Sequence, residues 1–278
     1  MVKPPENLET FASFVKIVEA LRGPDGCPWD KEQTHRSLVP FAIEETFELA
    51  DAIESGDDQE TVGELGDVLL QVVLHAEIAR QDGRYSIDDV IRGISEKMVR
   101  RHTHVFAEVK VDSSKDVLKN WAEIKAKEKA GKPKAKNFEL PSALPALQRA
   151  HKIGDKTQRA GFDWPDAKGV FEKVDEEMLE LKLEFAKISP TSAISNDLKT
   201  KLEHELGDVL FSVAQLARHL NIDAEQALRT TNARFEKRYF HMRNHVEESG
   251  RDWAHLTDTD KENAWQATKV ALANGQKT

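Results

Sequence analysis

"IEETFELADAIESGDDQETVGELGDVLLQVVLH", residues 43–75, sets carboxylates into two apolar helical patterns. Apolar residues recur at three- and four-residue spacing on both sides of "ESGDD", which predicts two helices joined by a turn. In the E-E-x-x-E motif, Glu45 and Glu48 share one helix face, and in the E-x-x-D motif Glu64 and Asp67 do the same. If the two helices pack antiparallel, these four carboxylates converge.

The same helical periodicity extends over the rest of the chain, and no convincing series of alternating strands interrupts it. The expected helices cover residues 8–21, 38–53, 62–79, 90–106, 117–129, 170–188, 198–220, 224–246 and 261–273. Glycine, proline and aspartate cluster between these segments, where helices are expected to stop. The sequence therefore predicts an all-α protein.

An internal repeat divides the chain into two parts. "EETFEL" at residues 44–49 matches "EEMLEL" at 176–181, and "ELGDVL" occurs at both 64–69 and 205–210. The segments "WAEIK" and "WQATK" follow in the same order, with Trp121 and Trp265 in matching places. We predict two copies of one helical domain, at residues 1–130 and 146–278. A lysine-, glycine- and proline-rich linker at residues 131–145 joins them.

Composition limits the kind of partner this chain can have. Its 278 residues are 39% hydrophobic and 32% charged, with a formal net charge of -9, which argues against stable nucleic-acid binding. No apolar run approaches the roughly 18 residues of a membrane span. The only cysteine, Cys27, cannot form an internal disulfide, and "MVKPPENLETF" has no apolar signal core. We expect a cytoplasmic protein with no membrane contact.

The clustered carboxylates predict a metal site. Like charges a few ångströms apart repel one another, and a multivalent cation removes that repulsion. An oxygen-only ligand set favours a hard ion, for which Mg²⁺ is the natural choice, and Mg²⁺ commonly also binds substrate phosphates. Single acidic motifs are usually solvated helix faces, but here both motifs occur twice in the same order. The acids of the second copy are Glu176, Glu177, Glu180, Glu205 and Asp208.

Glycines and basic residues add to the pattern. Gly66 and Gly207 each lie between the two acids of an E-x-x-D motif, where a missing side chain permits close approach by a helix or a ligand. Downstream, two basic pairs at i,i+4 spacing could neutralise phosphate, or could equally form ordinary salt bridges. These pairs are Lys97 with Arg101 and Arg234 with Arg238. Trp121 and Trp265 could stack on a base or pack in a core.

Together these motifs resemble the MazG family of all-α nucleoside triphosphate pyrophosphohydrolases, and "GCPWDKEQTHRSL", "RRHTHVF", "LPALQRAHKI" and "GFDW" extend the resemblance over nearly the whole chain. The resemblance implies Mg²⁺-dependent hydrolysis of nucleoside triphosphates to monophosphate and pyrophosphate. It also implies a homodimer whose four-helix bundles are completed by dimerisation. By the same resemblance the metal ligands are Glu177, Glu180, Glu205 and Asp208, with Glu45, Glu48, Glu64 and Asp67 in the first copy. The implied substrate contacts are Lys173, Lys201, Arg234, Arg238 and Trp265.

The first copy departs from the family pattern at two positions, where we match Phe41 to Lys173 and Thr61 to Lys201. Because two phosphate-neutralising charges are then missing, we expect the C-terminal site to be the main catalyst. In the expected mechanism Glu176 or Glu177 takes a proton from the attacking water.

Two other classes of protein fit parts of the pattern. A di-iron carboxylate bundle would need paired Glu-x-x-His motifs, but only Glu32 and His35 have this spacing, in an expected loop without a repeat partner. A catalytically weak, nucleotide-sensing regulatory protein would keep the acids and the substrate contacts. Pyrophosphate release separates that protein from an enzyme.

Overall fold

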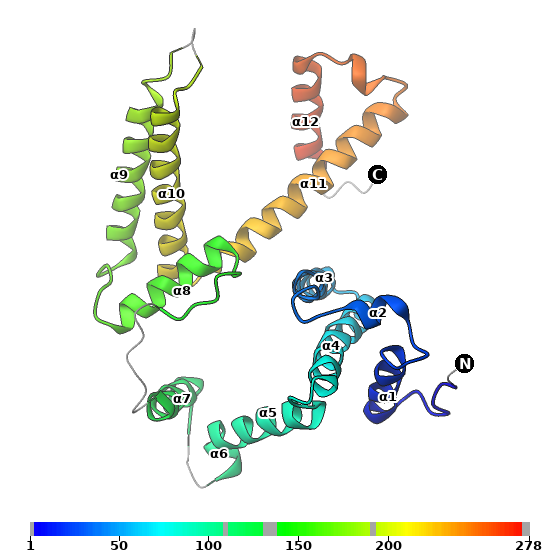
Figure 1. Ribbon diagram of the computed structural model, residues 1–278. Helices are drawn as coiled ribbons and strands as arrows, with labels where there is room; N and C mark the ends of the chain where they lie inside the picture. The colour runs from blue at the N-terminus through cyan, green and yellow to red at the C-terminus, as the bar shows by residue number, and fades with distance from the viewer. Residues whose placement is uncertain (1–2, 108–110, 130–137, 190–192, 274–278) are drawn as a thin grey trace. The chain divides into compact units, whose positions relative to one another are not determined.

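The computed structural model describes residues 3–107, 111–129, 138–189 and 193–273, and these contain helices and no strand. The fold is all-α, as predicted (Figure 1). The chain forms two compact units, Met1–Lys132 and Pro133–Thr278. Residues 131–137 of the expected linker lie outside the described residues, and residues 138–145 form no helix.

Unit 1 is built around the antiparallel pair α3–α4. Its helices are α1 (Phe11–Leu21), α2 (Pro28–Glu32), α3 (Val39–Ser55), α4 (Asp58–Gln81), α5 (Ile87–Arg101), α6 (Thr103–Phe106) and α7 (Ser114–Lys129). Gly56 ends α3 with a φ of 75°, a left-handed conformation that glycine adopts without strain. Asp57 then begins α4 by accepting hydrogen bonds from the backbone N–H groups of Gln59 and Glu60. The "ESGDD" turn therefore closes the α3–α4 hairpin.

An apolar core anchors this hairpin at one end. Val18 of α1, Leu38 before α3, and Val73, Leu74 and Ile78 of α4 pack together, and each is at most 6% exposed. The three α4 residues of this core lie next to His75, one to three turns beyond the E-x-x-D motif. The acidic half of the hairpin consequently remains outside the core.

Unit 2 repeats the hairpin as α9–α10. Its helices are α8 (Ala146–Arg159), α9 (Ala167–Phe185), α10 (Asn196–His219), α11 (Ala224–Glu248) and α12 (Asp258–Ala273), with a short 3₁₀ helix at Trp253–His255. Side-chain oxygens of Asp166, Ser195 and Asp223 cap the N-termini of α9, α10 and α11. In this unit α9 packs along α10, α8 packs on α10, and α12 packs on α11 (Figure 1).

Small residues let α8 approach α10 closely. Ala150 of α8 packs with Ala214 of α10 and Ala224 of α11 in a buried cluster. Gly154 faces Gln215, and a Cβ added to this glycine would lie only 1.9 Å from the Gln215 Oε1 atom. A side chain at Gly154 would therefore displace the side chains of Gln215 and Arg218.

The structure corrects three expectations about the elements. Residues 90–106 do not form one helix, because His102 has a non-helical backbone (φ −103°, ψ 53°) between α5 and α6. Glu32 ends the short helix α2 instead of lying in a loop. Helix α8 was not predicted, although Leu147, Ala150 and Ile153 recur along it at three-residue spacing. No helix in the described ranges has the length and apolarity needed to cross a membrane.

Candidate metal centre

In unit 2 the α9–α10 hairpin brings three carboxylates together. Oxygen atoms of Glu177, Glu180 and Glu205 all lie within 4.8 Å of one another. Glu177 and Glu180 share a face of α9, and Glu205 reaches them from α10. Glu177 is only 6% exposed, so its charge is largely removed from water. The predicted E-E-x-x-E and E-x-x-D motifs therefore do meet across the hairpin.

Asp208, the fourth predicted ligand, joins this group through Glu205. It forms a second group of ligand atoms with Glu205 and His204. The Nδ1 atom of His204 lies 3.1 Å from Asp208 Oδ2 and 3.7 Å from Glu205 Oε1. His204 was not predicted, although its i,i+4 spacing from Asp208 could have identified it.

In unit 2, the Lys173 side chain contacts two glutamates of the E-E-x-x-E motif. Its Nζ atom lies 2.7 Å from Glu177 Oε1 and 2.9 Å from Glu176 Oε1. Hydrogen bonds from the Lys173 ammonium to Glu177 and Glu176 raise the pKa of this lysine, so it stays charged at neutral pH. A predicted substrate contact is thus already positioned beside the acids.

Charge repulsion remains within the unit 2 cluster. Desolvation raises the pKa of Glu180, and the charges of Glu177 and Glu205 raise it further, while Lys173 lowers it. Such a cluster favours uptake of either a proton or a cation.

Unit 1 forms the corresponding cluster between α3 and α4. Oxygen atoms of Glu45, Glu48 and Glu64 lie within 4.8 Å of one another. Desolvation raises the pKa of Glu45, and Asp67 is the neighbouring charge that raises it most. Desolvation also raises the pKa of Glu64, followed by the charge of Glu48. Asp67 therefore affects the unit 1 cluster through its charge. In unit 2, Asp208 is linked to the cluster through Glu205.

The two clusters differ in their neighbouring charges, and one predicted match needs correction. Aligned on the shared "ELGDVL", Lys201 lies four residues before Glu205, so its counterpart is Glu60 and not Thr61. Glu60 is among the charges that raise the pKa of Glu64. Unit 1 thus has Phe41 and an acid where unit 2 has two lysines.

Close approach by a helix or a ligand was expected at the two motif glycines, and no helix contact is found there among the described residues. A Cβ added to Gly66 or Gly207 would meet no described atom within 4 Å beyond its own helix and chain neighbours. Both glycines face open space beside the acids. Access for a ligand is the part of the expectation that remains.

The other predicted substrate residues lie apart from the unit 2 acids or have their own partners. Lys201 forms an ion pair of 2.8 Å with Asp197. Arg234 donates a hydrogen bond to Thr231 on α11, and the Trp265 ring of α12 packs 5.1 Å from the Phe235 ring. Arg238 is half-buried on α11. Their roles toward a substrate stay predictions.

The matching residues of unit 1 are similarly engaged. Arg101 forms an ion pair of 2.6 Å with Glu128, and Trp121 packs edge-on against His102 with ring centroids 5.1 Å apart. Lys97 is half-buried on α5. These contacts fit the ordinary salt-bridge and packing interpretations of the sequence.

The donor set of both clusters fits a hard divalent cation. Each trio offers carboxylate oxygens, which are the ligands that Mg²⁺, Mn²⁺ and Ca²⁺ prefer. The Oε2 atom of Glu64 is buried and has no hydrogen-bond partner among the described residues. A buried, unpartnered carboxylate oxygen is costly unless a cation or a proton neutralises it.

Comparison with known proteins agrees with the repeat and with its motifs. The MazG nucleotide pyrophosphohydrolase domain matches residues 33–106 and again residues 170–243. The nucleoside triphosphate pyrophosphohydrolase/pyrophosphatase MazG of Thermotoga maritima is 42% identical over 93% of this chain and 95% of its own length. The nucleoside triphosphate pyrophosphohydrolase of Escherichia coli K12 is 40% identical over 92% of this chain and 95% of its own. Both acidic clusters lie within the matched segments, and the chain belongs to the MazG family.

Proposed function

We propose that the chain hydrolyses nucleoside triphosphates to nucleoside monophosphate and pyrophosphate, with Mg²⁺ held by Glu177, Glu180, Glu205 and Asp208. The observation that carries this proposal is the trio of carboxylates beside the charged Lys173. A cation bound there supplies positive charge to the triphosphate and lowers the pKa of a bound water. The names of the two relatives support the same reaction.

Residues of the chain serve as the general base, stabilise the leaving group and contact the substrate. Glu177 is buried and belongs to the carboxylate trio, whereas Glu176 is exposed and paired with Lys173, so we assign Glu176 as the base that takes the water proton. The water oxygen forms a bond to the α-phosphorus as the bond from this phosphorus to the bridging oxygen breaks. Lys173 and Lys201 on the hairpin stabilise the charge of the departing pyrophosphate. Arg234, Arg238 and Trp265 serve as further substrate contacts.

A second copy of the chain completes the bundle in this proposal. Leu179 and Leu183 of α9 are 57% and 58% exposed, and Leu206 and Leu210 of α10 are each 49% exposed. A two-helix hairpin with this much exposed apolar surface is expected to pack against a partner. Light scattering should give twice the 31.4 kDa chain mass, and Leu206→Asp should shift the protein toward monomer. A wild-type monomer would contradict the dimer.

Product analysis tests the reaction directly. Each nucleoside triphosphate is incubated with the protein and Mg²⁺, and the products are separated by anion-exchange chromatography. Monophosphate and pyrophosphate in equal amounts are expected, and chelation of the metal should stop their release. Release of nucleoside diphosphate and orthophosphate would show cleavage between the β- and γ-phosphates, which would contradict the proposed reaction. Tight nucleotide binding without products would favour the nucleotide sensor. We assign the activity to the cytoplasm. The single cysteine cannot form a disulfide within the chain, and proteins of the cytoplasm seldom contain disulfides.

A further inference from the structure

A chain of hydrogen-bonded side chains joins the segment before α3 to α4 in unit 1. The Arg84 Nη2 atom lies 2.6 Å from His35 Nε2, and His35 Nδ1 lies 2.7 Å from His75 Nδ1. The two imidazole rings are stacked, with their centroids 5.0 Å apart and their planes inclined by 6°. Asp82 Oδ2 lies 2.8 Å from the same Arg84 nitrogen, so this nitrogen donates one hydrogen to each of its two partners.

The protonation states of the two histidines follow from the chemistry of the arginine. A guanidinium only donates hydrogen bonds, so His35 Nε2 accepts one and carries no proton. The neutral ring then has its proton on Nδ1, which donates to His75 Nδ1. His75 accepts at that atom and keeps its own proton on Nε2. Both histidines are therefore neutral in the closed chain, and each has one tautomer that completes it.

Uptake of a proton by either ring breaks the chain. A protonated His35 would present an N–H group to the Arg84 guanidinium, and a protonated His75 would present one to the Nδ1–H group of His35. Burial lowers the pKa of His75, and the charge of His35 lowers it further. A histidine with a lowered folded-state pKa stabilises the fold above its unfolded pKa of about 6.5, and this stabilisation is lost as the pH falls below that value.

The other charged groups near this part of α4 have partners of their own. Glu77 is paired with Arg80 at 2.6 Å, and Glu19 of α1 lies 3.9 Å from the same arginine. The first turn of α3 carries no acid. His35 is the neighbouring charge that acts on His75. These contacts therefore include no carboxylate that would stabilise a charged imidazole in the pair.

The chain holds residues 33–38 against the core of unit 1. Leu38, three residues after His35, is fully buried in that core and directly precedes α3. Arg22 at the end of α1 donates to the Gln33 carbonyl at 3.2 Å, at the other end of the segment. The histidine contact is thus the attachment to α4 in the middle of the segment. Its loss would loosen the start of α3, the helix that carries the E-E-x-x-E motif.

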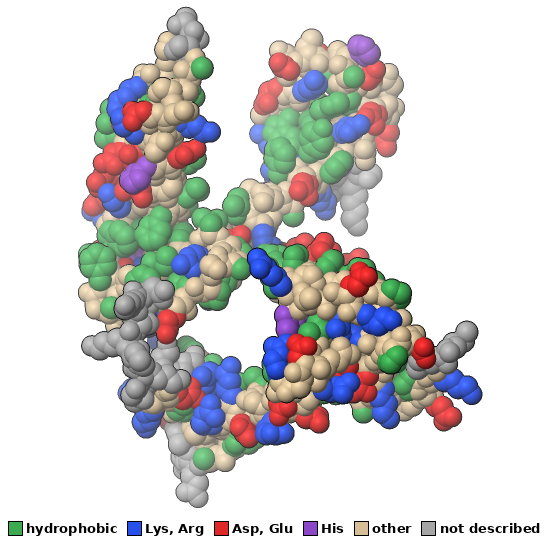
Figure 2. Space-filling model, in the orientation of Figure 1, with side chains coloured by type: hydrophobic (Ala, Val, Ile, Leu, Met, Phe, Trp, Pro, Cys, Tyr) green, Lys and Arg blue, Asp and Glu red, His purple; other side chains and the backbone are tan. Residues whose placement is uncertain are grey.

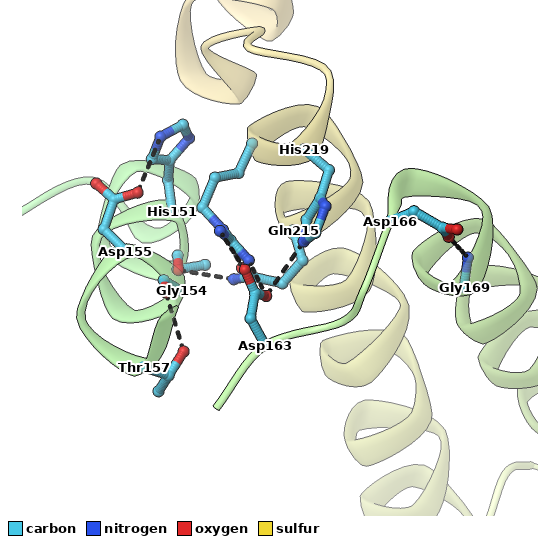
Figure 3. A network of polar contacts seen from close by, with 11 residues as sticks. His151, Gly154, Asp155, Thr157, Asp163, Asp166, Gly169, Gln215 and His219 are labelled. Carbon is cyan, nitrogen blue, oxygen red and sulfur yellow. Dashed lines mark hydrogen bonds and ion pairs between the residues drawn. The ribbon is translucent and has the colours of Figure 1, made fainter. Parts of the chain in front are cut away.

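The histidine pair has no counterpart at the matching place in unit 2. Aligned on "ELGDVL", Leu216 takes the place of His75. Further along α10, His219 Nε2 lies 3.1 Å from Asp163 Oδ1, and Arg218 donates to the same carboxylate at 3.0 Å (Figure 3). A protonated His219 still donates to this carboxylate, so mild acidification keeps that network intact. The acid-sensitive arrangement therefore belongs to unit 1.

We propose that Arg84, His35 and His75 form a pH-sensitive latch, which is closed while both imidazoles are neutral and opens when either takes up a proton. Opening releases residues 33–38 from α4. Histidine is the side chain whose ordinary pKa lies between pH 5 and pH 8. The face shown in Figure 2 carries many acidic and basic side chains but few histidines. Mild acidification therefore acts on few groups besides the latch.

Hydrogen–deuterium exchange of the full-length protein at pH 7.5 and pH 5.5 tests the latch, with rates corrected for the intrinsic effect of pH. Peptides that cover residues 33–42 should exchange roughly threefold to tenfold faster at the lower pH, since one coupled proton contributes up to about tenfold over this range. In His75→Asn the side-chain oxygen can still accept from His35 but takes up no proton, so the pH dependence should weaken. The matched control is His255→Asn, which changes a histidine whose side chain is 84% exposed in unit 2 and should keep the wild-type pH dependence. Equal pH dependence in wild type and His75→Asn would overturn the proposal.

Nuclear magnetic resonance of wild type with ¹⁵N-labelled histidines gives a second test that needs no folded His75 variant. Long-range ¹H–¹⁵N spectra distinguish protonated from unprotonated ring nitrogens. At pH 7.5 His35 should carry its proton on Nδ1 and His75 on Nε2, with the His35 signals identified by their loss in His35→Gln. A proton on His35 Nε2 would overturn the latch, because the Arg84 guanidinium would then face a donor.

Discussion

The α3–α4 and α9–α10 hairpins carry the same six-letter motif and the same carboxylate trio, yet their surroundings differ in charge. In unit 2 Lys173 is bonded to Glu177, whereas Phe41 takes the place of this lysine in unit 1. Glu60 adds another negative charge beside the unit 1 cluster. We therefore expect the repeated carboxylate geometry to determine where a cation binds, and the neighbouring charges to determine how well a bound polyphosphate is neutralised.

Asp163→Asn should have the largest effect on stability, because the units anchor their hairpins differently. Unit 1 uses an apolar core of large side chains, whereas unit 2 has a small alanine cluster and an Arg218 side chain that is 5% exposed and paired with Asp163. Leaving a buried charge without its partner costs about 3 kcal/mol or more. Urea unfolding followed by tryptophan fluorescence should show this loss. Asp82→Asn, which breaks an exposed pair with Arg84, should cost under about 1 kcal/mol. Equal losses would contradict the difference between the anchors.

The same ion pair gives unit 2 a specific acid sensitivity. Hydrogen bonds from Arg218 are the main cause that lowers the pKa of Asp163 to about 2. A carboxyl whose folded-state pKa is lowered stabilises the fold above its unfolded pKa of about 3.9, and this contribution is lost as pH falls toward 2. Unfolding free energies measured from pH 5 to pH 2.5 should therefore fall less steeply for Asp163→Asn than for wild type. If the unfolding free energies of wild type and Asp163→Asn fell equally with pH, Asp163 would not be a source of the acid sensitivity.

Lys173→Gln should lower kcat/KM by roughly tenfold to a hundredfold, because it removes one positive charge from the departing pyrophosphate. The control is Lys168→Gln on the same helix, whose side chain is 83% exposed and pairs only loosely with Glu172. Steady-state pyrophosphate release measures both variants. If the two variants behave alike, Lys173 has no special role.

Cation binding should weaken on acidification in both units, and more steeply in unit 1. Desolvation raises the pKa of both Glu45 and Glu64, while in unit 2 the raised pKa is that of Glu180. A cation must displace the protons that these groups take up, so affinity falls as pH drops, beginning above the ordinary value of 4.5. Mn²⁺ titrations followed by electron paramagnetic resonance test this in two variants. Glu180→Gln leaves the unit 1 site intact, and Glu48→Gln leaves the unit 2 site intact. Equal pH slopes would contradict the inferred charge difference.

The smallest effect is expected at the two motif glycines. Because a Cβ at either position meets open space, Gly66→Ala and Gly207→Ala should each stabilise the fold by about 0.5–1 kcal/mol. Thermal unfolding measures this gain. If Gly207→Ala stabilises the fold but slows turnover while Gly66→Ala leaves turnover unchanged, the glycine provides ligand access at the C-terminal site alone. Destabilisation by either alanine would contradict the inference that both glycines face open space.

The sequence predicted the hairpins and their acids because both depend on local spacing. Periodicity placed Glu177 and Glu180 on one face, and the repeat indicated which acids belong together. Helix α8 was missed although its sequence carries a helical signal, because Leu147, Ala150 and Ile153 recur at three-residue spacing on one face. The pairing of Asp163 with Arg218 spans 55 residues, and no local pattern predicts it. The break at His102 depends on its backbone conformation, which periodicity alone does not indicate.

Pyrophosphate release by two matched ligand variants tests the central claim that the sites are unequal. Glu48→Gln and Glu180→Gln each remove one charge from the corresponding carboxylate of a trio. In the full-length protein Glu180→Gln should lower kcat by roughly a hundredfold or more, whereas Glu48→Gln should keep most of the wild-type rate. Circular dichroism confirms that both variants are folded. The opposite ranking, or two equal losses, would contradict the assignment of catalysis to the C-terminal cluster.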